Sequence, residues 1–473
     1  MQGMPFTPLS PAPEQLILAH SSSQWKTIRS MLGLVIVVFM IVQITTLIFY
    51  GLYELDAAIT LVSSLCLLPF VLLFVSLRKP KLAHVIRGNE SIYGSQFNII
   101  NPSTVIQSPT PLVLQHHIVH NSAPLEMPRG MHLWLLFFSG VLVSSMFMLP
   151  LLLFGATVIS LSLALLVAIP ALLVGFSTPV FAWWSTSHRY FGLPTSRRMG
   201  EWMLIAGMFS TLPAIIVNSL VGPLLLEAVG MDTINSSSLG FGIILFGFAP
   251  IGEEIFKACA VLTLARFIDS RRRGFQVGFT VGLGFALLEN LGYILSSFAV
   301  GDAVAVNFAL TSILRGISSI PGHGVWTGIS GYAIGSYLVS RQRNQLYDVM
   351  DDASNRTVKP NWMLVNSRGE VVEQSSGSGQ ERIDVPVWLC ASQDKAWPLP
   401  VTPVKGVGLA ILGHSFWNGS LWGTELLFSS LPTIQMVGVQ LGWITFMIVA
   451  LWYITRRIIP TALGESNRSS KAF

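Results

Sequence analysis

The sequence predicts an all-α polytopic membrane protein with about ten transmembrane helices and both termini on the cytoplasmic side. The first observation is the composition: 52% of the 473 residues are hydrophobic and 11% are charged, whereas a soluble domain carries about 25% charged residues. The second is a series of apolar runs that are long enough to cross a bilayer. The third is the distribution of Lys and Arg residues between the loops. The composition therefore excludes a soluble globular protein.

A helix needs about 20 apolar residues to cross a hydrocarbon core roughly 30 Å thick. Ten runs reach this length, and the eighth is too long for one straight helix. Within it the segment SSIPGHG (318–324) is expected to break or bend the helix, because proline cannot continue the hydrogen-bond ladder. The predicted spans are 31–52, 57–77, 132–153, 156–182, 202–226, 239–265, 275–298, 304–340, 406–429 and 433–455.

The basic residues predict the orientation of these spans. Of 28 Lys and Arg residues, only Lys257 and Arg315 fall within a span. Cytoplasmic loops collect Lys and Arg, and an inner N-terminus places all the other basic residues on the inner side. The net charge of +5 then follows from topology, and we expect no nucleic-acid partner. We expect an integral multi-pass protein of the plasma membrane.

The loops and spans suggest a division of the chain around one membrane core. The inner loop 78–131 contains NIINPSTVIQ and PLVLQHHIVH, which look more like strands than helix. We expect a polar cytosolic N-terminus (1–30), four accessory helices (31–182) around that loop, a catalytic membrane core (200–340), a cytosolic insertion (341–405), two helices that complete the core (406–456) and a cytosolic tail (457–473).

Few ionisable residues lie deep within the spans. Glu253, Glu254 and Glu289 are the only such residues among 23 Asp and Glu, and His323 and His414 are the only ones among nine His. An ionisable group at the centre of a span costs about 2.5–3.5 kcal/mol on insertion scales, so such groups tend to be paired and functional. This set therefore predicts a buried site rather than packing.

The spacing of the acids predicts how they pair. Glu253 precedes Lys257 by four residues and Glu254 precedes it by three, so both carboxylates can reach the ammonium. At 1.5 Å per residue, Glu253 and Glu289 both lie roughly 20 Å from the inner face. The two carboxylates can therefore face each other across neighbouring spans.

This combination of residue types suits the hydrolysis of an amide bond. A carboxylate with a nearby His can hold and deprotonate a water. His414 and Asn418 share one helical face in HSFWN, and together they can stabilise an oxyanion. Phe285 and Glu289 share another face.

Three other interpretations stay open at this point. The Glu–Glu–Lys set can be a structural ion pair, and the other polar residues can be hydrogen bonds between helices. The same residues can form the relay of a proton- or cation-coupled transporter, although no repeat between the halves is visible. A non-catalytic membrane scaffold is the third interpretation.

Four segments carry a resemblance to a known family. PIGEEIFK, GFALLEN, RGISSIPGHGVWTG and GHSFWN resemble, in order, the pattern of the PrsW family of intramembrane proteases, each on a separate predicted span. That pattern is Glu-Glu-x-x-Lys, Phe-x-x-x-Glu-Asn, a His on a Gly-rich helix, and His-x-x-x-Asn or Asp. The wider superfamily includes the type II CAAX prenyl endopeptidases, which have a His where this chain has Glu289.

The resemblance implies a role for each residue and a substrate embedded in the bilayer, either a protein or a peptide. It implies Glu253 as general base, Glu254 beside it, Glu289 in place of the water-holding His, His323 as a water or metal contact, and His414 with Asn418 as the oxyanion site. Lys257, Phe285 and Asn290 are implied as supporting residues. Glu253, Glu289, His323 and His414 are the candidate zinc ligands, and a metal-free glutamic protease is equally open.

Overall fold

The computed structural model describes residues 24–78, 81–88, 96–101, 104–108, 112–119, 125–193, 195–299, 303–354 and 391–463. Among these residues, nine helical segments are long and apolar enough to cross a membrane. The ninth predicted span (406–429) is not among these nine and forms helix α12 (Pro403–Leu427), which is more polar because it carries several Gly, Ser and Trp residues as well as His414 and Asn418. The all-α membrane architecture is confirmed, and the orientation of the termini stays a prediction.

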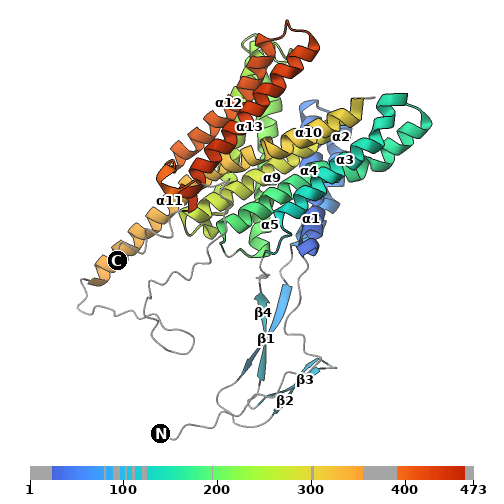
Figure 1. Cartoon of the computed structure of the whole chain (residues 1–473). Coiled ribbons are helices and arrows are strands. Elements are labelled where there is room, and N and C mark those ends of the chain that lie inside the picture. Colours follow the sequence, from blue (N-terminus) through green and yellow to red (C-terminus); the bar gives the residue numbers. More distant parts are fainter. Residues whose placement is uncertain are drawn as a thin grey trace.

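The helices follow the predicted spans in order (Figure 1). Most of them extend beyond the predicted boundaries, since their polar terminal turns fall outside the apolar runs. The largest extensions are at the start of α1 (Gln24) and at the ends of α4 (Phe191), α11 (Ser354) and α13 (Leu463). The helices are α1 (Gln24–Tyr53), α2 (Ala57–Leu77), α3 (Gly130–Phe154), α4 (Val158–Phe191), α5 (Arg197–Ile216), α6 (Gly222–Glu227), α7 (Leu239–Ile243), α8 (Ala249–Thr263), α9 (Arg271–Ser297), α10 (Val304–Ile317), α11 (Ser319–Ser354), α12 and α13 (Thr433–Leu463).

The eighth span breaks where the sequence predicts. Helix α10 ends at Ile317 and α11 begins at Ser319, with the non-helical Ser318 between them. Pro321 has no N–H to donate to the carbonyl of Ile317, four residues earlier, so the ladder cannot run through this point. The break sets the direction of the α11 turn that carries His323.

Two π-helical segments, η1 (Val217–Val221) and η2 (Ile244–Phe248), interrupt the fifth and sixth spans. Each precedes a proline, Pro223 or Pro250, that cannot donate to the carbonyl four residues back. The residue before each proline bonds five residues back instead: Gly222 to the Val217 carbonyl and Ala249 to the Ile244 carbonyl. Such π turns occur frequently at functional sites, and both of these border the cavity described below.

Helix α9 is the centre of the bundle, with 83% of its most apolar stretch buried. It approaches α11 through Gly278 and Gly282, where an added Cβ would lie 2.2 Å from the carbonyl oxygens of Thr327 and His323 respectively. These two glycines therefore allow the close approach of α9 and α11. The contact holds Glu289 of α9 beside His323 of α11.

Substitution of Gly282 by alanine is therefore expected to destabilise the protein by about 1–3 kcal/mol, because α11 must move away from α9. Thermal unfolding in detergent measures this effect. Gly438→Ala on α13 is the matched control, since an added Cβ there meets no atom within 4 Å. Equal unfolding temperatures for the two variants would contradict the close contact.

The predicted strands in the loop 78–131 are present. Strand β1 (Lys81–Gly88) pairs antiparallel with β4 (Leu112–Val119), and β2 (Gln96–Asn101) pairs with β3 (Thr104–Ser108). They extend from the end of the bundle where α1 begins (Figure 1).

The predicted insertion 341–405 is only partly described. Residues 355–390 lie outside the described residues, whereas the segment after them packs on the end of α13. Ala391 and Trp397 donate their N–H groups to the carbonyls of Arg456 and Arg457 (both 2.9 Å).

Candidate active site

Helix α8 presents two buried carboxylates and one buried ammonium. Lys257 is fully buried, and its Nζ lies 2.8 Å from Glu254 Oε1 and 3.3 Å from Glu253 Oε2. This is the predicted i,i+3 and i,i+4 pairing. Glu254 is also fully buried, whereas Glu253 retains 8% of its exposure. Of the two acids, only Glu253 lines the cavity described below, as a general base must.

His323 connects this group to α9. Its Nδ1 lies 2.8 Å from Lys257 Nζ, and its Nε2 lies 2.7 Å from Glu289 Oε2. A protonated lysine only donates hydrogen bonds, so Nδ1 accepts from Lys257 and Nε2 carries the proton that it donates to Glu289. The lysine thereby selects one tautomer of His323.

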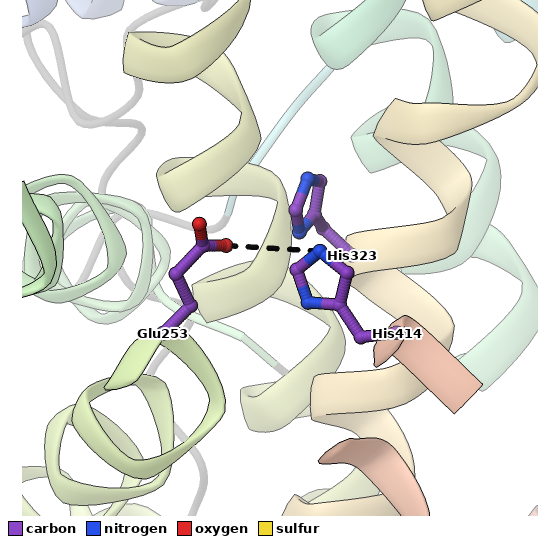
Figure 2. Close-up of side chains that lie close together, drawn as sticks. All are labelled: Glu253, His323 and His414. Carbon is purple, nitrogen blue, oxygen red and sulfur yellow. Dashed lines mark ion pairs between the residues drawn. The ribbon is translucent and has the colours of Figure 1, made fainter. Parts of the chain in front are cut away.

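His414 completes the cluster from α12. Its Nδ1 lies 3.0 Å from Glu254 Oε1, and its Nε2 lies 3.9 Å from Glu253 Oε2. Because a carboxylate accepts, Nδ1 is the donor to Glu254, and Nε2 is directed at Glu253. Figure 2 shows Glu253, His323 and His414 converging from three helices, with the Glu253–His414 pair dashed.

The cluster borders a cavity of about 770 Å³. Carboxylates, imidazoles and a guanidinium line part of it, whereas the residues from α1 and η1 that line it are uncharged. The lining polar residues are Gln43, Thr211, Asn218, Ser219, Glu253, Glu289, Tyr293, Arg315, Ser318, Ser319, His323, His414 and Asn418. The space is within the range of small-molecule and peptide sites.

The remaining predicted residues have distinct surroundings. Asn418 lines the cavity, and its Nδ2 donates one hydrogen bond to the Leu245 carbonyl of η2 (3.1 Å). This bond uses only one of the two N–H groups of the Asn418 amide. The Phe285 ring lies under Lys257 Nζ, 3.9 Å from the ring centroid. Both residues thus contact the site directly.

Asn290 has a structural position instead. It is fully buried, and it donates to the carbonyl of Gly175 (3.2 Å), which Pro179 leaves without its helical partner. It also accepts from Arg315 Nε (3.0 Å). Asn290 therefore joins α9 to α4 and α10, and it does not line the cavity.

Three further residues contact the site, and the sequence singles out only one of them, Arg315, as a basic residue within a span and without a role in the chemistry. Asn218 Nδ2 donates to Glu253 Oε1 (3.2 Å), and Thr327 Oγ1 donates to Glu254 Oε2 (3.4 Å). One guanidinium nitrogen of Arg315 lies 3.1 Å from Glu289 Oε2. Asn218 is likewise a polar residue in an otherwise apolar run, and this is the signal that could have found it.

The donor atoms of Glu253, His323 and His414 lie within 4.8 Å of one another, close enough to share one ion. Glu289, the fourth candidate ligand, is not part of this group and is bonded to His323 instead. With all of its groups ionised, the cluster has three carboxylates and two cations, Lys257 and Arg315, and therefore one negative charge in excess. One carboxylate and two imidazoles are also a donor set of catalytic zinc sites.

A cluster of acids and imidazoles lies beside a cavity, inside a bundle of apolar helices, as expected of an enzyme that acts within the membrane. Residues 195–350 match the model of the PrsW family intramembrane metalloproteases. The resemblance is thus confirmed over this part of the chain, and the match supports a PrsW-like intramembrane endopeptidase. The match includes α8, α9 and His323, and it ends before α12. No curated protein and no solved structure matches the chain significantly.

Proposed function

We propose that the protein cleaves a peptide bond of a membrane-embedded substrate with a water that Glu253 activates. The observation that carries this proposal is the 3.9 Å separation of Glu253 Oε2 and His414 Nε2. One water can lie within hydrogen-bonding distance of both atoms, about 2.8 Å from each. Neither Lys257 nor Glu254 lines the cavity, so these two residues act through their neighbours.

The chain's own residues account for each proton in the reaction. Glu253 accepts a proton from the water while the water oxygen forms a bond to the carbonyl carbon. The carbonyl π electrons move onto its oxygen, which becomes the oxyanion. Glu253 then returns the proton to the amide nitrogen as the C–N bond breaks, and a new carboxyl group and a new amine result. Asn218, through its hydrogen bond to Oε1, keeps the carboxylate of Glu253 in position.

The oxyanion would be stabilised by Asn418 of α12, whereas the Nε2 atom of His414 on the same face carries no proton when Nδ1 donates to Glu254 and is left to accept from the water or to bind a metal. Asn418 has a second N–H beyond the one that it donates to Leu245, and this group is available to a substrate oxygen in the cavity. Removal of one such donor typically lowers kcat by about 10²–10³-fold. Asn418→Ala is therefore expected to reduce kcat more than it changes KM.

We further propose that Glu253, His323 and His414 hold a zinc ion, in which case one carboxylate oxygen of Glu253 would bind the metal and the other would be left to take the proton. The donor set, its spacing and the surplus negative charge support this assignment, as does the description of the matching family. For His323 to bind through Nε2 or Nδ1, its contact with Glu289 or Lys257 must open. A zinc ion would supply Lewis-acid activation of the water and of the peptide carbonyl.

Removal of the metal tests the zinc assignment. Elemental analysis of the purified protein is expected to give about one zinc per chain, and His414→Ala should lose most of it, because catalytic zinc has only three protein ligands. Chelation should abolish peptide cleavage, and added zinc should restore it. Full activity after complete removal of metal would instead mean that Glu253 and His414 act on a bare water.

A further inference from the structure

Helix α1 contributes one polar residue to the cavity that the proposed chemistry does not use. Gln43 lies in the apolar run GLVIVVFMIVQITTLIFYGLY, and it is exposed and lines the cavity. This helix lies outside the segment that matches the protease family. The residue is at least ten positions from either end of its span, as is Glu253 in the sixth span.

The neighbouring polar residues of α1 satisfy their own hydrogen bonds. Thr45 Oγ1 donates to the Ile41 carbonyl (2.7 Å), and Thr46 Oγ1 donates to the Val42 carbonyl (3.0 Å). In the described part of the chain, no group bonds to the side-chain amide of Gln43. An unpaired amide at this depth is costly, because lipid offers no hydrogen-bond partner. Its partner is therefore expected in the cavity.

We propose that Gln43 binds the main chain of the substrate segment in the active-site cavity. An extended peptide in a membrane cavity exposes N–H and C=O groups that lipid cannot satisfy. A glutamine amide offers both a donor and an acceptor for such a chain. Gln43 carries no charge, and hydrogen bonds to the backbone of a substrate do not depend on the substrate's side chains. Gln43 can therefore bind substrates of different sequence. This makes α1 a wall of the substrate site rather than only an accessory helix.

The other acceptors of the cavity support this division of roles. Glu253 already accepts from Lys257 and Asn218, and Glu289 is bonded to His323 and paired with Arg315. The charged side chains of the cavity thus already bond to other side chains of the cluster. The uncharged residues from α1 and η1, Gln43 among them, are better suited to hold a neutral backbone.

A backbone ester scan tests this inference, which rests on the proposed proteolysis. The probe is a synthetic single-span peptide of about 25 apolar residues with a Gly-Ser centre, reconstituted with the purified full-length protein. In each version of the probe, one peptide bond near the cleaved bond is replaced by an ester. The ester removes one N–H and weakens the adjoining carbonyl as an acceptor.

We expect Gln43→Leu to lower kcat/KM for the all-amide probe about tenfold, the effect of losing one or two hydrogen bonds. An ester at one particular position should lower kcat/KM of the wild type by a similar factor. The same ester should lower kcat/KM of Gln43→Leu almost no further. Gln43→Asn should recover part of the loss. Thr46→Val, which removes a hydroxyl that α1 satisfies itself, should cleave like the wild type.

Two outcomes would overturn the inference alone: wild-type kcat/KM in Gln43→Leu, or an ester effect of the same size in Gln43→Leu and the wild type. Failure of the wild type to cleave any all-amide probe would overturn the proposed proteolysis as well. A purely structural role of Gln43 would change the unfolding temperature without abolishing the effect of one particular ester.

Discussion

Replacement of Glu253 by glutamine is expected to lower kcat for peptide cleavage by at least about 10³-fold, in the range found for loss of a general base. Glutamine has the same shape and can still accept the hydrogen bond from Asn218, but it cannot take a proton from water. Lys257 keeps its closer contact with Glu254 (2.8 Å), so the variant should fold. Initial rates on a reconstituted transmembrane peptide measure the effect.

Glu227→Gln is the matched control for this variant. Glu227 ends α6 and accepts from Thr233 Oγ1 (2.6 Å), away from the cavity. It should retain the rate of the wild type. If Glu253→Gln cleaves as fast as this control, Glu253 is not the base.

Replacement of Lys257 by methionine is expected to destabilise the fold by about 3–5 kcal/mol, because it leaves buried carboxylates without their cation. Glu253 and Glu254 both bond to the Lys257 ammonium, and Glu254 is fully buried. His323 Nδ1 also loses its donor, so the imidazole is free to turn. Unfolding in detergent and the yield of folded protein measure the loss.

A double variant shows whether charge is the cause. Lys257→Met combined with Glu254→Gln removes one negative charge together with the cation, and it should recover about half of the lost stability or more, since neighbouring sites couple. Lys405→Met, at the exposed start of α12, should unfold like the wild type. No recovery in the double variant would mean that lost packing, and not the unpaired charge, causes the effect.

The sequence predicted the class of fold and most of the cluster because membrane insertion penalises charge. Each ionisable residue deep in a span is an exception that needs a reason, so Glu253, Glu254, Glu289, His323 and His414 stand out without any structure. The pairing of Lys257 with both acids follows from helical spacing alone. The break before Pro321 likewise follows from local chemistry.

Contacts between distant spans could not be predicted in this way. The hydrogen bond of Asn218 to Glu253 depends on the π turn η1, whose extra residue per turn changes which side chains face the cavity. The hydrogen bond of Asn290 to α4 depends on the carbonyl that α4 leaves without a helical partner. The contacts of Arg315 depend on the position of α10 beside α9. Gln43 is an isolated polar residue in its apolar run, and only the cavity brings it into the same space as the acids.

The most direct test of the central claim is peptide cleavage in water labelled with heavy oxygen. Purified protein and a transmembrane peptide are incubated in the labelled water, and the masses of the products are measured by mass spectrometry. The account predicts two fragments, with one heavy oxygen in the new carboxyl group from the wild type and no product from Glu253→Gln. Unlabelled fragments, or labelled fragments in equal yield from Glu253→Gln, would contradict it.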